Sequence, residues 1–342
     1  MQNFKNDRVS SSRIRSLDGV RAVAILMVFA HHALNFALRL NVHGFWMGVD
    51  IFFVLSGFLI TGVLLDNKAR SLSHFFRRFY ERRARRLLVP YALALGTTSF
   101  FFGVAWIRHW YFYFFLTNFL TVLQIPHPLA FNPLWSLAVE EQFYIVWPFV
   151  VYFLSEKSLA RACAVLIVAA PILRGTMHFQ THWPIYALTP FRMDLLAAGA
   201  LIALVWRRRN NWIHRYGTVS GAILVCSGIF GMAWLGKANI STFTNTPMAN
   251  VLLYESTLLI GVGVILFALA GRGVGILENR VMAYIGKISY TMYLVHMIFL
   301  EIPAIQNLGG WPYILAALSC TIGYAAISWR WIETPLLRAK TS

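Results

Sequence analysis

An arginine and a histidine lie on the first apolar segment, "SLDGVRAVAILMVFAHHALNFAL", which runs from Ser16 to Leu38. Eleven residues separate Arg21 from His32, so on a helix they lie three turns plus about 20° apart, roughly 16 Å along the axis. We therefore predict that both side chains face the same interior groove, with His31 turned about 80° away as a packing or interfacial residue. Histidine suits proton transfer because its unperturbed pKa is near 6.5. The alternative for His32 is a neutral, hydrogen-bonded packing residue.

Further ionisable residues lie within apolar segments, where each costs about 2.5–3.5 kcal/mol at a helix centre. In "NPLWSLAVEEQFYIVWP" (132–148), Glu140 and Tyr144 stack at i,i+4, and Glu141 points to another face. Some of these groups should simply pair with one another. Their number nevertheless predicts a polar interior that starts at a basic cytoplasmic mouth. The remaining candidates are Asp18, Asp50, Arg192, Lys287 and His296.

The composition belongs to the membrane class, because 58% of residues are hydrophobic, 13% are charged, and the mean hydropathy is +0.60. We predict one all-α integral membrane domain over 1–342, a polytopic bundle of about ten transmembrane helices. The first segment contains Arg21 and lacks a cleavage pattern, so we expect it to stay in the mature protein. The predicted spans are 17–38, 47–66, 87–107, 136–154, 159–177, 190–206, 216–235, 249–270, 281–302 and 312–332.

The placement of positive charge sets the predicted orientation. If the aromatic segment 109–123 is re-entrant or interfacial, cytoplasmic segments hold 22 of the 30 Lys and Arg residues. Both termini (1–16 and 333–342) are then cytoplasmic. The net charge of +17 is explained by topology, and we predict no nucleic-acid partner.

The basic cytoplasmic loop 67–86 carries eight cations, more than topology needs. Arg82/Arg85 and Arg83/Arg86 each have i,i+3 spacing, which places two guanidiniums on one face of a helix. Such pairs suit a polyanionic ligand, with anionic membrane lipids or topology alone as alternatives. The three cysteines have no metal-ligand spacing, and the sequence predicts no metal site.

Seven motifs resemble, in order, those of the bacterial membrane acyltransferase-3 family: "LDGVRAVAILMVFAHH", "GVDIFFVLSGFLIT", "RRARRLLVPY", "LWSLAVEEQFYIVWP", "FRMDLLAAGALIA", "GKISYTMYLVH" and "WIETPLL". The resemblance implies about ten spans. It also implies O-acylation of cell-surface carbohydrates or secondary metabolites from an acyl-CoA donor, usually acetyl-CoA. The chain looks like the stand-alone type without a C-terminal esterase-like domain.

The resemblance also implies roles for particular residues. The family's Arg-x10-His pair matches Arg21 and His32, and the first carboxylate of "SLAVEEQFY" is Glu140. Its Arg-x-x-Arg element, expected to bind the donor, matches Arg83 and Arg86 or Arg82 and Arg85. His32 would be a general base or carry the acyl group, and Arg21 would orient the donor or stabilise the thioester oxygen. Glu140 would set the protonation of the imidazole or bind the sugar.

The expected function is O-acylation, in the bacterial cytoplasmic (inner) membrane, of an envelope glycan, a lipid-linked saccharide or a secondary metabolite. The rival is a proton-coupled transporter or exporter, which also uses a polar track across a bundle. An inverted repeat would favour the rival, and the sequence contains none. The outer segments "QIPHPLAFNPLW" and 109–123 are either a sugar-stacking lip or an interfacial aromatic belt.

Overall fold

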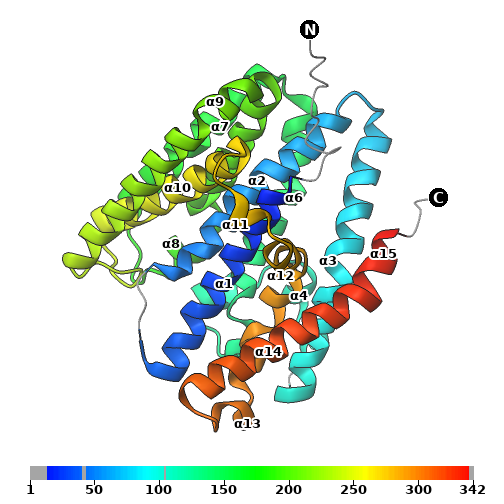
Figure 1. The fold of residues 1–342 in the computed structure, drawn as a ribbon, viewed down its shortest axis with the longest axis vertical. Coiled ribbons are helices and arrows are strands. Elements are labelled where there is room, and N and C mark those ends of the chain that lie inside the picture. The colour runs from blue at the N-terminus through cyan, green and yellow to red at the C-terminus, as the bar shows by residue number, and fades with distance from the viewer. Residues whose placement is uncertain (1–13, 41–43, 104, 339–342) are drawn as a thin grey trace.

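A computed structural model describes residues 14–40, 44–103 and 105–338. Every regular element within those ranges is helical, which confirms the predicted all-α class (Figure 1). Of the two predicted cytoplasmic tails, residues 1–13 and 339–342 lie outside the described ranges.

Long helices account for all ten predicted spans. They are α1 (Arg15–Leu38), α2 (Gly48–Asn67), α3 (Leu72–Phe102), α6 (Leu134–Phe153), α7 (Glu156–Thr176), α9 (Met193–Lys237), α10 (Pro247–Ala270), α12 (Arg280–Glu301) and α14 (Gly310–Ser328). Two spans fall on α9, whose backbone leaves the helical region at Arg209 (φ −142°, ψ 43°). Six helices in the described ranges are long and apolar enough to cross a membrane. Ten crossings and cytoplasmic termini stay predictions.

Short helices connect the long ones. They are α4 (Trp110–Tyr113), α5 (Asn118–Val122), α8 (Trp183–Ala187), α11 (Gly275–Glu278), α13 (Pro303–Gln306) and α15 (Thr334–Arg338); a π-helical turn, Trp329–Glu333, joins α14 to α15. Because α4 and α5 have four and five residues, neither can cross a hydrocarbon core of about 30 Å. Segment 109–123 is therefore not a membrane-crossing helix, as predicted.

The predicted basic loop 67–86 needs correction, because most of it is helical. Helix α2 ends at Asn67 and α3 begins at Leu72, so the true connection is short. Phe75 and Phe79 are buried in the main core, which gives the first turns of α3 an apolar face to pack. The arginines therefore lie on a helix, as their i,i+3 spacing predicted, and only the short connection 68–71 is a loop.

Two close helix crossings position the polar residues. At the first, a Cβ on Gly286 of α12 would lie 1.8 Å from the Asp18 carbonyl oxygen of α1, so only glycine allows this approach. At the second, a Cβ on Gly199 of α9 would lie 1.9 Å from the Val54 carbonyl oxygen of α2. The first crossing aligns α1 with α12, which brings the histidines of the two helices together further along.

Candidate active site

One cavity, here called the arginine cavity, has a volume of about 330 Å³ and lies among α1, α2, α3, α6 and α12. Its polar lining residues are Arg21, Ser56, Arg82, Arg83, Arg86, Ser136, Glu140, Tyr144, Ser289, Tyr290 and Tyr293. Four guanidiniums and one carboxylate give it an excess of positive charge. Arginine forks match phosphate oxygens in geometry as well as charge, so the arginine cavity is chemically suited to a phosphorylated anion.

The α3 arginines differ in where they point. Arg83 and Arg86 both line the arginine cavity; Arg82 lines it too, and Arg85 is not among its lining residues. The pair Arg83/Arg86 therefore faces the cavity as a unit, whereas Arg82/Arg85 does not. This geometry favours the first of the two registers that the sequence left open.

Arg21 is held by a neighbour on its own helix. Its Nη1 lies 2.7 Å from Asp18 Oδ1, and the Asp18 side chain is buried. A buried carboxylate three residues earlier fixes the guanidinium at the cavity wall. The sequence candidate Asp18 is thus a positioning residue for Arg21.

Glu140 lies in the arginine cavity and is bound there by two hydroxyls. Ser56 donates to Oε1 (2.8 Å), and Tyr144 donates to Oε2 (3.1 Å). The Arg83 guanidinium lies 3.7 Å from the centre of the Tyr144 ring and 3.5 Å from Glu141 Oε1. These contacts make Glu140 part of the arginine cluster. The expectation that it sets the protonation of His32 is not supported, because another residue takes that place.

A second cavity, here called the histidine cavity, has a volume of about 510 Å³ and lies beside α1, α8 and the segment from α5 to α6. Among the described residues, its lining contains no Asp, Glu, Lys or Arg. It is instead aromatic and neutral-polar, with His31, His32, Asn35, Trp46, Gln124, His127, Asn132, Trp135, His182, Trp183 and Tyr186 among its residues. Partial burial lowers the pKa of His182, so this ring is neutral at pH 7.

The environment of His32 assigns its tautomer. His296 Nδ1 lies 2.7 Å from the Tyr293 carbonyl oxygen, which can only accept, so His296 carries its proton on Nδ1. Its Nε2 is therefore an acceptor, 3.2 Å from His32 Nδ1. His32 Nδ1 also lies 3.0 Å from the Val28 carbonyl oxygen. Because both partners accept, His32 carries its proton on Nδ1, and its Nε2 keeps the lone pair that a general base or a nucleophile needs.

Arg21 and His32 line different cavities. The sequence predicted one shared groove, whereas the structure places Arg21 in the arginine cavity and His32 in the histidine cavity. The two cavities are neighbours, because Val49 of α2 and Tyr293 of α12 line both. The single predicted groove is therefore divided at this pair. The expectation for His31 also needs correction, because His31 lines the histidine cavity together with His32.

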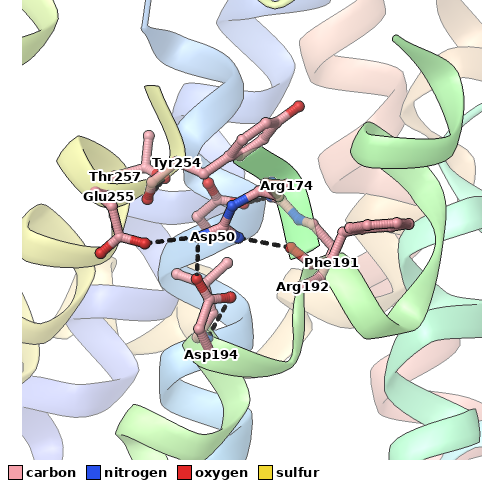
Figure 2. A network of polar contacts seen from close by, with 9 residues as sticks. Asp50, Arg174, Phe191, Arg192, Asp194, Tyr254, Glu255 and Thr257 are labelled. Atoms are coloured by element: carbon pink, nitrogen blue, oxygen red, sulfur yellow. Dashed lines mark hydrogen bonds and ion pairs between the residues drawn. The ribbon is translucent and has the colours of Figure 1, made fainter. Parts of the chain in front are cut away.

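The candidates Asp50 and Arg192 belong to a separate buried network that lines neither cavity (Figure 2). Arg192 Nη2 pairs with Asp50 Oδ1, and both side chains are fully buried. Figure 2 shows Arg174 donating to Asp194 Oδ2 and Glu255 Oε1, each at 2.6 Å, and to the Phe191 carbonyl oxygen. These pairs join α2, α7, α9 and α10, as expected for charges that hold a bundle together.

Several residues of the site escaped the sequence reasoning. Val49 and Tyr293 resemble ordinary apolar and belt residues, and Ser56 lies in an apolar run without any sign of its contact with Glu140. The contact between His32 and His296 was not predicted either. A usable signal was the spacing in "YLVH", since Tyr293 lies at i−3 of His296, where its carbonyl can accept from the ring.

Comparison with known proteins gives relatives that are similar to this chain in sequence over nearly its whole length. The chain is 29% identical to the peptidoglycan O-acetyltransferase OatA of Listeria monocytogenes over 380 aligned positions, which cover 97% of the chain and 57% of OatA. It is 30% identical to YrhL of Bacillus subtilis, provisionally named a peptidoglycan O-acetyltransferase, with 94% and 55% covered. The chain thus spans little more than half the length of these relatives. No solved structure matches the chain.

The model of one protein family, described as an acyltransferase domain, matches residues 14–332. That range contains both cavities, the His32–His296 pair and the arginines of α3. The chain belongs to the acyltransferase-3 family.

Proposed function

We propose that this chain is a membrane O-acyltransferase that moves an acyl group, acetyl in the first instance, from acyl-CoA to a hydroxyl of an envelope carbohydrate. The observation that carries the proposal is the adjacency of two chemically opposite cavities, which share Val49 and Tyr293. One is rich in guanidiniums, and the other contains His32 and no charged residue among its described lining residues. Transfer of an acyl group from an anionic donor to a neutral acceptor calls for two adjacent binding cavities, one positively charged and one uncharged.

The donor occupies the arginine cavity in this proposal. CoA carries a pyrophosphate and a 3′-phosphate, which suit Arg83 and Arg86, and Arg82 adds a third cation at the same wall. The cavity then opens toward the cytoplasm, the side to which the positive-inside rule assigns the basic first turns of α3.

The acceptor occupies the histidine cavity. Rings such as Trp183 and Tyr186 can pack against the apolar face of a sugar, and amides such as Asn132 and Gln124 can bond its hydroxyls. The names of OatA and YrhL assign peptidoglycan as the acceptor of those relatives. We take a peptidoglycan-type glycan as the first acceptor to test.

His32 performs the transfer in one of two ways. As a base, its Nε2 takes the proton of the acceptor hydroxyl, whose oxygen bonds to the thioester carbonyl carbon. The C–S bond then breaks, and the CoA sulfur leaves with that proton. As a nucleophile, Nε2 first bonds to the carbonyl carbon, which gives an acyl-imidazolium and expels CoA as a thiolate. The acceptor oxygen then bonds to that carbon and displaces neutral imidazole, and the hydroxyl proton goes to the CoA sulfur.

Arg21 acts on the body of the donor and not on the reacting carbonyl. It lies about 16 Å along α1 from His32, farther than the two side chains reach together. A thioester within reach of His32 therefore leaves Arg21 beside the pantetheine or phosphate portion of CoA. Asp18 keeps the guanidinium oriented for that contact.

The direct test uses the purified chain in lipid nanodiscs with radiolabelled acetyl-CoA and soluble muropeptides from digested peptidoglycan. We expect free CoA thiol to appear together with label in a base-labile ester on the glycan. Absence of thioester consumption at matched protein levels would contradict an acyltransferase and leave the transporter reading to be tested.

A further inference from the structure

Two side chains, one aliphatic and one aromatic, line both cavities. They are Val49 on α2 and Tyr293 on α12, and only 7% and 9% of their surfaces are exposed. Each is therefore buried in the bundle and borders both cavities.

Tyr293 is fixed in place from several directions. Its hydroxyl shares a 2.5 Å hydrogen bond with Ser136 Oγ and donates to the Pro133 carbonyl oxygen (3.0 Å). Its ring packs edge-on against Phe52, with centroids 6.2 Å apart. Its own carbonyl holds His296, the partner of His32. A ring tied to α6 and α2 cannot swing aside without breaking buried hydrogen bonds.

Val49 is a rigid partner for that ring. A β-branched residue in a helix keeps essentially one χ1 rotamer, so its two methyl groups form a fixed wall. Directly before it, Gly48 allows close approach to α1, since a Cβ there would lie 2.5 Å from the Ala24 carbonyl oxygen. The close packing at Gly48 limits movement of the backbone that carries Val49.

We propose that Val49 and Tyr293 form an acyl-width gauge, which admits straight acyl groups and rejects those branched beside the carbonyl. The proposal rests on the function proposed above, in which the acyl group reaches His32 from the arginine cavity. A straight chain is no wider than one methylene along its length. A branch next to the carbonyl adds a methyl group at the point where the thioester must lie, and packed walls do not yield to an extra methyl.

Isomeric donors test the gauge without a change in size or charge. Initial rates of CoA release are measured in nanodiscs with butyryl-CoA and isobutyryl-CoA, with soluble muropeptides as acceptor. We expect the wild type to prefer the straight isomer about 10-fold or more in kcat/KM, the usual effect of one misplaced methyl group. Val49→Ala should reduce that preference by about the same factor, with unchanged affinity for CoA itself.

A matched control is Val54→Ala, which removes the same two methyl groups from α2 at a buried position that faces neither cavity. It should keep the preference of the wild type. If Val49→Ala does not yield folded protein, Tyr293→Leu widens the gauge from the other side and should give the same relaxation. Equal use of both isomers by an active wild type, or an unchanged preference in the widened variant, would overturn the gauge alone. A wild type that consumes no thioester would overturn the proposed function and the gauge with it.

Discussion

The arginine cavity and the histidine cavity differ in charge, although they share two lining residues. The first has guanidiniums from α1 and α3 around one carboxylate, and the second has no charged residue among the described residues that line it. Arg21 lies within a predicted span, where a charge costs about 2.5–3.5 kcal/mol at a helix centre. A charge retained at such a cost is expected where an anion must be bound. A lining without charged residues, as in the histidine cavity, is expected where the ligand is neutral.

The two cavities also differ in the role that we propose for them: the arginine cavity binds the donor, and the histidine cavity holds the reacting nitrogen. The arginine cavity contains polar groups that bind each other, such as Glu140 with Ser56 and Tyr144. The histidine cavity contains a ring whose tautomer is set by buried acceptors, which leaves one nitrogen ready to react. Variants in the two cavities should therefore fail in different ways.

The largest expected effect on activity is that of His32→Ala. It removes the reacting nitrogen, and positioned proton transfer is worth about 10²–10⁴-fold. We expect kcat to fall by that range while affinity for CoA stays unchanged, measured by CoA release and by calorimetry. His178→Ala, at an exposed histidine that lines neither cavity, is the control. Wild-type turnover in His32→Ala would contradict the assignment of the acyl transfer to His32 and to the histidine cavity.

The largest expected effect on stability lies outside both cavities, in Asp50→Asn. It leaves the fully buried Arg192 guanidinium without its carboxylate, a change worth about 3–5 kcal/mol. Thermal unfolding in detergent should show a clear drop. Glu81→Gln, which weakens the exposed i,i+4 pair with Arg77, should cost far less. Equal losses would mean that burial does not distinguish the two pairs.

His296→Leu should have an intermediate effect confined to the histidine cavity. It removes the acceptor that helps to fix the tautomer and orientation of His32, and the loss of such a supporting partner typically costs about 10–100-fold. We expect a lower kcat and an altered pH–rate profile, with unchanged affinity for CoA. His296→Gln, whose side-chain oxygen can accept, should recover part of the rate. A fall in affinity for CoA instead would place His296 with the donor.

The double variant Arg83→Ala/Arg86→Ala should show the opposite pattern to His296→Leu, in which the affinity for CoA falls and kcat does not. Each removes a charge-assisted hydrogen bond worth about 1.5–3 kcal/mol, so affinity for CoA should fall by at least about 10-fold and more steeply at low salt. Calorimetric titration with CoA measures it. Arg85→Ala, one turn away from Arg82 and outside the cavity lining, should change little. Unchanged affinity for CoA in the double variant would mean that the α3 arginines do not bind the donor and only help to set the orientation of the chain in the membrane.

The smallest effect is expected for Trp183→Ala in the histidine cavity. Burial of some 40 Å² of sugar face at about 25 cal/mol per Å² is worth ~1 kcal/mol, so KM for the acceptor should rise about fivefold. The KM for acetyl-CoA should not move. A shift in the donor KM alone would contradict the assignment of the two cavities.

The sequence predicted what helical geometry and hydropathy control. The common face of Arg21 and His32 follows from 100° per residue, and the all-α class follows from apolar runs. The failure of 109–123 to cross was predicted from charge placement alone. Each of these properties depends on neighbours along the chain.

The rest depends on contacts between distant segments. Asp50 and Arg192 are 142 residues apart, so their pairing was not visible. The division of the groove is set by how α12 packs on α1 at Gly286, which places Tyr293 between the levels of Arg21 and His32. A tyrosine in an apolar span looks like any other belt residue until that crossing is known.

The most direct measurement is a cryo-electron microscopy structure of the chain in nanodiscs with a non-hydrolysable thioether analogue of acetyl-CoA. We expect its phosphates against Arg83 and Arg86 and its acyl tip between Val49 and Tyr293, pointing at His32 Nε2. Density for CoA in the histidine cavity, or outside both cavities with His32 out of reach of the acyl carbon, would contradict the account.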